Sequence, residues 1–143
     1  MAKQIINQSQ AQTTKLGYAQ ITATPTGTTS ATAVQVTGLT STITIPSGGR
    51  SVKITFMCRD LQCSATGYVL ASIWDGTVGS GTQIAATQIY VSGANFGQPG
   101  SAFAIVTPAA GAKTYNIGLQ TTAGTATVEA ALTYPAFILV EDM

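Results

Sequence analysis

Charged side chains are scarce in this 143-residue chain, at 8% of its residues, against roughly 25% in an average soluble domain. Six Lys or Arg and five Asp or Glu leave a formal net charge of +1 at pH 7. Copies of the chain therefore repel one another only weakly, whereas a free domain usually keeps its net charge further from zero. This favours a subunit that packs against copies of itself or against another assembly. The alternative is a stable monomer coated with Thr and Ser.

Histidine is absent, so catalytic arrangements of the Ser-His-Asp or Cys-His type cannot form. Among the five carboxylates, Asp75 fits a tight turn, and Glu141 and Asp142 lie beside the C-terminus. The remaining two, Asp60 and Glu129, have no sequence feature that places them together across a cleft, as a glycosidase requires. We therefore predict that the chain is not an enzyme and that it holds no cofactor and no metal.

Cysteine is nearly absent as well, with Cys58 and Cys63 as the only two. Their C-x4-C spacing fits neither a zinc knuckle nor a redox C-x-x-C motif, and no His is present as a further ligand. Two reduced thiols, one in the core and one in a loop, are the favoured interpretation for a cytoplasmic product. A local disulfide that closes the segment between them is the alternative.

Long apolar runs and basic clusters are also missing. No apolar run approaches the ~20 residues that a membrane-spanning helix needs, and the N-terminal MAKQIINQSQ has no apolar segment of the signal-peptide type. The six Lys and Arg are scattered, so no phosphate-binding patch is predicted. We expect synthesis in a cytoplasm without a cleaved leader, and neither a membrane nor a nucleic acid as partner.

Thr and Gly are abundant instead, with 24 and 15 residues. Thr favours strands and Gly favours turns, and short alternating segments recur between turn signals without any sustained helical stripe. The sequence therefore predicts a single all-β domain, an antiparallel jelly-roll-like sandwich of about nine or ten strands. The expected strands are 17–23, 33–36, 41–45, 51–59, 67–74, 82–91, 101–107, 113–120, 125–134 and 136–140.

The first 15 residues (1–15) are Gln-rich and show no sustained period of 2 or 3.6. We interpret them as an extended N-terminal arm in front of a β-sandwich domain at 16–143. Ile5 and Ile6 are the only large apolar pair in the arm, so they are the expected anchors on a neighbouring subunit.

Several aromatic side chains are candidates for a sugar-binding platform, namely Tyr68, Trp74, Tyr90 and Phe96. Trp74 falls in an expected strand, which favours a place in the core or at a subunit interface. Phe96 falls in the Gly-flanked loop 92–100, where an apolar side chain has little local cover. Asn95, Phe96 and Gln98 are therefore the expected ligand contacts of this loop.

Five segments of the chain, read in order, carry a family resemblance: LGYAQITATPTG, LTSTITIPSGGRSVKITF, ASIWDGT, PAAGAKTYNIGLQTTAGTATVEA and PAFILVEDM. Together they resemble a β-sandwich module of bacteriophage virion proteins, found at the C-terminal end of minor tail proteins. The resemblance covers about residues 16–143. The family pattern has a cysteine-free loop where this chain has CRDLQC at 58–63.

The resemblance implies an oligomeric structural part of the virion, for which we expect a homotrimer, with no catalytic residues to transfer. A single module behind a short arm suits a capsid decoration, or cement, protein. Such a protein binds the major capsid protein or other virion subunits in the assembled shell and stabilises it. The alternative is an adhesin module of a tail or head fibre, whose loops bind glycans of the host surface.

Overall fold

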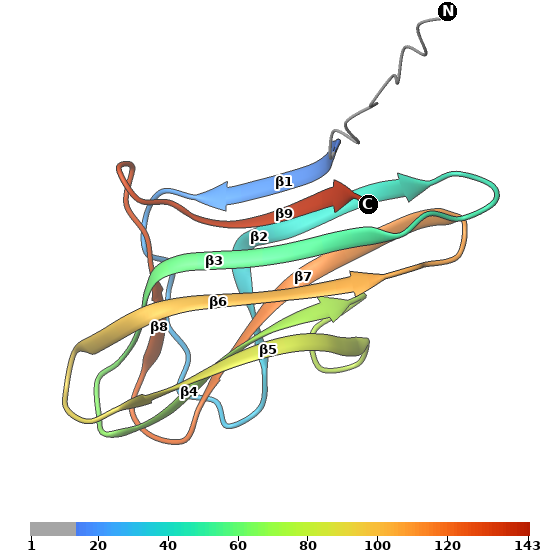
Figure 1. The fold of residues 1–143 in the computed structure, drawn as a ribbon. Helices are drawn as coiled ribbons and strands as arrows, with labels where there is room; N and C mark the ends of the chain where they lie inside the picture. Colours follow the sequence, from blue (N-terminus) through green and yellow to red (C-terminus); the bar gives the residue numbers. More distant parts are fainter. Residues whose placement is uncertain (1–13) are drawn as a thin grey trace, which may run out of the picture.

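The computed structural model describes residues 14–143, which fold into two antiparallel β-sheets that face each other (Figure 1). Sheet A has the strand order β1-β9-β3-β6, and β8 also pairs with β3; sheet B has the order β2-β7-β4-β5. The strands are β1 (Lys15–Ile21), β2 (Val34–Ile45), β3 (Val52–Cys63), β4 (Gly67–Asp75), β5 (Thr82–Val91), β6 (Phe96–Val106), β7 (Gly111–Thr121), β8 (Ala126–Glu129) and β9 (Ala136–Asp142). Within these residues no helix is long and apolar enough to cross a membrane.

A single core lies between the sheets. Alternate residues of each strand point inward, as the pleat requires, and the bulkiest fully buried side chains come from both layers. Phe56 and Ile54 of β3 and Ile138 of β9 contribute from sheet A, and Tyr115 of β7 and Ile73 of β4 from sheet B. The prediction of an all-β chain with antiparallel sheets is confirmed.

Strand β3 runs further than the expected strand 51–59. Its alternation changes phase, because Val52 to Cys58 bury every even residue whereas Leu61 and Cys63 are buried at odd positions. The change coincides with a bulge, at which Arg59 and Asp60 together face Pro99 of β6. Proline has no N–H for the ladder, and bulges are among the few places where a sheet accepts it.

The prediction that one cysteine lies in the core and the other in a loop is wrong. Cys63 does not lie in a loop, since it is the last residue of β3 and is buried like Cys58. Both are free thiols. The Cys63 thiol donates a hydrogen bond to the Ala123 carbonyl at 2.7 Å, which ties the end of β3 to the β7–β8 connection.

Three other expected boundaries are wrong. A single strand, β2, contains both of the expected segments 33–36 and 41–45. Gly38, with a φ of 88°, does not form a turn but lies where the pairing of β2 with β7 shifts in register, between Gln35 and Thr40. The expected loop 92–100 ends at Asn95, since β6 begins at Phe96. Of the expected strand 125–134, only 126–129 forms β8, and a bridge between Ala131 and Tyr134 closes a turn before β9.

The two ends of the described chain lie together at one end of the sandwich (Figure 1). The Asp142 amide donates to the Thr14 carbonyl at 2.9 Å, and the Met143 amide donates to the Ser51 carbonyl at 3.1 Å. Strand β1 begins at Lys15, the last residue of the expected arm. Ile5 and Ile6 lie outside the described residues, so their role as anchors stays a prediction.

Candidate binding surface

The outer face of sheet A carries a broad group of side chains that are mainly apolar, with Thr55 as the one aliphatic hydroxyl among them. Strand register places them in rows that cross all four strands: Tyr18, Leu139, Thr55 and Phe103 form one row, and Phe137 and Met57 lie in the next. Ile105 completes the group on β6. These members, called the sheet A face below, are Tyr18, Thr55, Met57, Phe103, Ile105, Phe137 and Leu139.

The sheet A face is exposed although it is apolar. Phe103 keeps 64% of its surface accessible, Ile105 55% and Met57 46%. At the centre of the face, the Thr55 hydroxyl is covered by its surroundings and has no hydrogen-bond partner within the described part of the chain. A contiguous apolar surface of this kind marks an interaction site in a soluble protein.

Sheet B presents a different outer face. Hydroxyl and amide groups occupy it, and they bond to one another across the strands: Thr42 with Thr114 at 2.9 Å, and Thr40 with the Asn116 side chain at 2.7 Å. Such a surface is already satisfied and well suited to water. Sheet B also exposes the Tyr68 and Tyr90 rings, but these two lie against each other on β4 and β5 and do not form rows across the whole sheet.

Cations lie over the aromatic rings of this layer. The Lys15 ammonium is 5.5 Å from the centre of the Tyr18 ring, and the Lys53 ammonium is 5.6 Å from the centre of the Phe103 ring. Both distances are within the range of cation–π attraction. Glu141 separates the two lysines in the neighbouring row, so charges of both signs border the apolar members.

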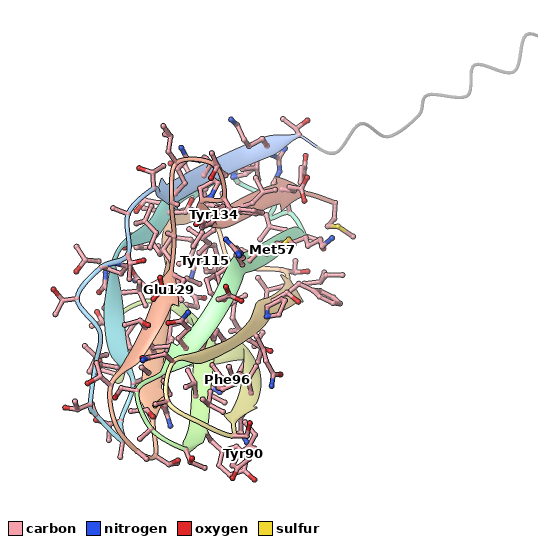
Figure 2. All side chains as sticks on the ribbon, turned by 90° about the vertical axis from the view of Figure 1, so that its left-hand side faces the viewer. Met57, Tyr90, Phe96, Tyr115, Glu129 and Tyr134 are labelled. Atoms are coloured by element: carbon pink, nitrogen blue, oxygen red, sulfur yellow. The ribbon has the colours of Figure 1, made fainter. Side chains whose placement is uncertain are left out.

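A shallow hollow opens at one side of the sheet A face. Its volume is about 350 Å³, and its lining is Met57, Cys58, Arg59, Pro99, Tyr134, Pro135 and Phe137. The Arg59 guanidinium stacks over the Tyr134 ring at 4.3 Å and forms the charged rim. Figure 2 shows Met57 and Tyr134 near each other, far from Phe96 and Tyr90 at the opposite end of the sandwich.

The structure brings together two carboxylates that no sequence feature links. Asp60 of β3 and Glu129 of β8 are direct cross-strand partners. Glu129 accepts hydrogen bonds from the hydroxyls of Thr24 at 2.9 Å and Thr127 at 3.0 Å, and Asp60 forms an ion pair with Arg59 at 3.5 Å. The pairing depends on long-range strand register, for which the sequence holds no signal. In residues 14–143 no three His, Cys, Asp or Glu side chains gather to hold a metal ion.

The expected ligand contacts lie at the β5–β6 connection. Asn95 forms the turn with a φ of 61°, and Phe96 is exposed at the first position of β6. Gln98 lies within β6, where its side-chain amide donates to the Tyr90 carbonyl at 3.1 Å. Tyr68 packs against Tyr90 with ring centres 5.1 Å apart. Of the predicted contacts, only Asn95 therefore belongs to a loop.

Trp74 is not a core residue. It lies half-buried on the outer face of sheet B, where its indole N–H donates to the Ser72 hydroxyl at 2.8 Å. A side chain at Gly118 would collide with the indole nitrogen at 2.8 Å, so glycine makes room for the ring. The place of Trp74 at a subunit interface stays a prediction.

A comparison of the sequence with protein-family models finds no matching family, and a comparison with curated proteins finds no matching relative.

Proposed function

We propose that this chain is a non-catalytic structural subunit of a bacteriophage virion, a capsid decoration protein that binds the assembled shell and stabilises it. The observation that carries the proposal is the sheet A face, an apolar surface across four strands in a chain of net charge +1. A subunit that stays packed against protein neighbours keeps such a surface away from water, and its low charge permits close packing. The chain is made in the host cytoplasm and ends up in the virion.

The strand order supports this assignment through the fold. β8 and β9 pair along the same edge of β3 and can be counted as one strand interrupted at the turn 130–135. If this combined strand is numbered 8, sheet A has the order 1-8-3-6 and sheet B has the order 2-7-4-5. Eight strands in this order form two Greek keys, the arrangement of a jelly roll, which recurs in viral capsid and lectin domains.

The mechanism is thermodynamic linkage. A protein that binds only the assembled shell lowers the free energy of that state by RT ln(1 + [L]/Kd) at each occupied site. A homotrimer presents three arms at once, and their combined binding exceeds that of a single arm. Ile5 and Ile6 are the proposed anchors on the major capsid protein.

Deletion of residues 1–12 tests the arm. We expect the shortened protein to keep the β spectrum in circular dichroism, because β1 begins only at Lys15. It should no longer bind shells that lack the native protein, and it should no longer raise the temperature at which those shells open. The matched control is the double variant Gln8→Ala/Gln10→Ala, which keeps both isoleucines and should bind. Unchanged occupancy of the shortened protein on shells contradicts the proposed arm.

A glycan-binding adhesin is the second candidate, and one observation favours it. Tyr68, Tyr90 and Phe96 expose aromatic surface near Asn95 and Gln98, whose amides could bond sugar hydroxyls. Copy number on the particle separates the two functions. Many copies spread over the shell indicate decoration, whereas a few copies at a vertex or tail tip indicate adhesion.

A further inference from the structure

We propose that copies of this chain join through the sheet A face, with Phe103 of one copy seated in the hollow beside Met57 of the next. This inference rests on the proposed function, for which a homotrimer is the expected form. It adds to that function the surface and the side chains through which the copies bind one another.

The inserted group comes from an edge strand. β6 is the last strand of sheet A, and Phe103 and Ile105 project from its outer side as two of the most exposed apolar side chains. On the opposite side of β6, the buried positions next to Phe103 hold the small Ala102 and Ala104, and Val106 at the end of the strand is partly buried against the core. The large apolar side chains of this part of β6 thus face outward. In a strand whose outer side stays in water, the large apolar side chains normally face the core and polar side chains face outward.

The receiving site is large enough for an aromatic ring. The hollow has a volume of about 350 Å³, and a cavity of about 150 Å³ already holds a benzene molecule. Met57, Phe137 and Tyr134 give it an apolar lining, and the Arg59 guanidinium lies at its rim over Tyr134. A phenyl group inserted there would gain apolar contacts on several sides.

A second copy is the partner that the charges favour. The row beside the apolar members reads Lys15, Glu141 and Lys53. Arg59 lines the hollow and forms an ion pair with Asp60. Each copy therefore offers both signs of charge to an identical neighbour, and the net charge of +1 adds little repulsion between copies.

The face also has a suitable size. Four strands about 4.8 Å apart and about 30 Å long cover roughly 600 Å² in projection. The accessible surface of such a corrugated layer exceeds its projection, and each partner of a standard interface contributes about 800 Å².

Two substitutions and their mixture test the contact. Phe103→Ser removes the inserted ring and leaves the hollow intact, whereas Met57→Arg fills the hollow and leaves the ring intact. By native mass spectrometry and light scattering we expect an oligomer for the wild-type chain and a monomer for each variant. The matched control is Tyr90→Ser, which removes another exposed aromatic ring, from the outer face of sheet B, and should leave the oligomer unchanged.

The mixture of the two variants gives the decisive result. Phe103 of the Met57→Arg chain still fits the hollow of the Phe103→Ser chain, so a one-to-one heterodimer should form. Because an unfolded variant could not pair, this rescue also shows that both chains are folded. Oligomers that persist in either variant alone, or variants that stay monomeric when mixed, overturn the proposal.

Shell binding by the wild-type chain separates this inference from the proposed function. An oligomer that forms as described but does not bind shells contradicts the function and leaves the contact standing. A wild-type chain that binds shells as a monomer contradicts the contact and leaves the function standing.

Discussion

Two hydroxyls of the core, those of Ser41 and Tyr115, are buried without hydrogen-bond partners among the described residues. Burial of such a group without a partner costs about 1–3 kcal/mol. For Tyr115, burial and, to a smaller extent, the negative charge of Asp75 raise the pKa to about 12. Burial also raises the pKa of the Cys58 thiol to about 12, although a hydrogen bond with the Gly100 backbone lowers it slightly. Both groups stay protonated in the folded chain at neutral pH.

The Cys58 thiol makes the fold sensitive to alkali. An unfolded thiol loses its proton near its ordinary value of 9.0, whereas the folded thiol keeps it until about pH 12. The stability is therefore complete below pH 9 and falls as the pH rises toward 12, since the unfolded state binds fewer protons there. We expect a loss of about 2 kcal/mol in the free energy of unfolding between pH 9 and pH 10.5. Urea unfolding at a series of pH values measures it.

The matched experiment uses a Tyr115→Phe background, because the raised pKa of Tyr115 adds a similar loss above pH 10. In that background, Cys58→Ala should lower the stability at neutral pH, through the small cavity it leaves. It should also flatten the fall between pH 9 and pH 10.5. An equal slope with and without Cys58 contradicts the assignment.

At the scale of elements, apolar segments bounded by clear turn signals were predicted best. The strand predicted at 82–91 has the same bounds as β5, and the ends of β4 and β7 differ from their predictions by one or two residues. The errors fall where a strand changes phase. In β3 the bulge opposite Pro99 moves Leu61 and Cys63 into the core positions that a strict period of 2 assigns to their neighbours. Only the tertiary pairing of β3 with β6 reveals this shift.

The candidate surface was harder to predict than the fold. Ala102 to Ile105 alternate small and large apolar residues, and size alone would turn Phe103 and Ile105 inward. Their register with β3 turns them outward, because Phe56 and Ile54 already fill the core there. The pairing of Asp60 with Glu129 depends in the same way on contacts between distant strands.

Gly100 of β6 tests how tightly β3 and β6 fit. A Cβ at this position would lie 2.7 Å from the Leu61 side chain and 2.8 Å from the Cys58 sulfur. Gly100→Val should therefore lower the free energy of unfolding by about 1–3 kcal/mol through overpacking. Chemical denaturation measures the change. The control is Ser101→Val on the adjacent, outward-facing position, which should leave the stability within about 0.5 kcal/mol; equal effects of the two substitutions contradict this packing.

At the scale of the whole molecule, the two layers of the sandwich have different surfaces. Sheet A exposes large apolar side chains bordered by charges of both signs, whereas sheet B exposes hydroxyls and amides that bond across its strands, together with the Tyr68 and Tyr90 rings. Association through sheet A would hide the first surface and leave the second in contact with water. The driving force between copies would then be hydrophobic, with the Lys15–Glu141–Lys53 row acting mainly on orientation.

This driving force gives association a distinct response to salt and temperature. Screening at higher ionic strength weakens ion pairs, whereas burial of apolar surface weakens on cooling. We expect the dissociation constant between copies to change less than about threefold from 50 to 500 mM NaCl, and to rise on cooling from 25 to 4 °C. Analytical ultracentrifugation measures both, with Lys53→Gln as the variant that removes a charge from the border and keeps the apolar members. Dissociation at high salt, or a large loss of association in Lys53→Gln, would contradict an apolar contact. Either result would show that the charged row supplies most of the binding free energy, because burial of apolar surface is not weakened by salt or by the loss of one charge.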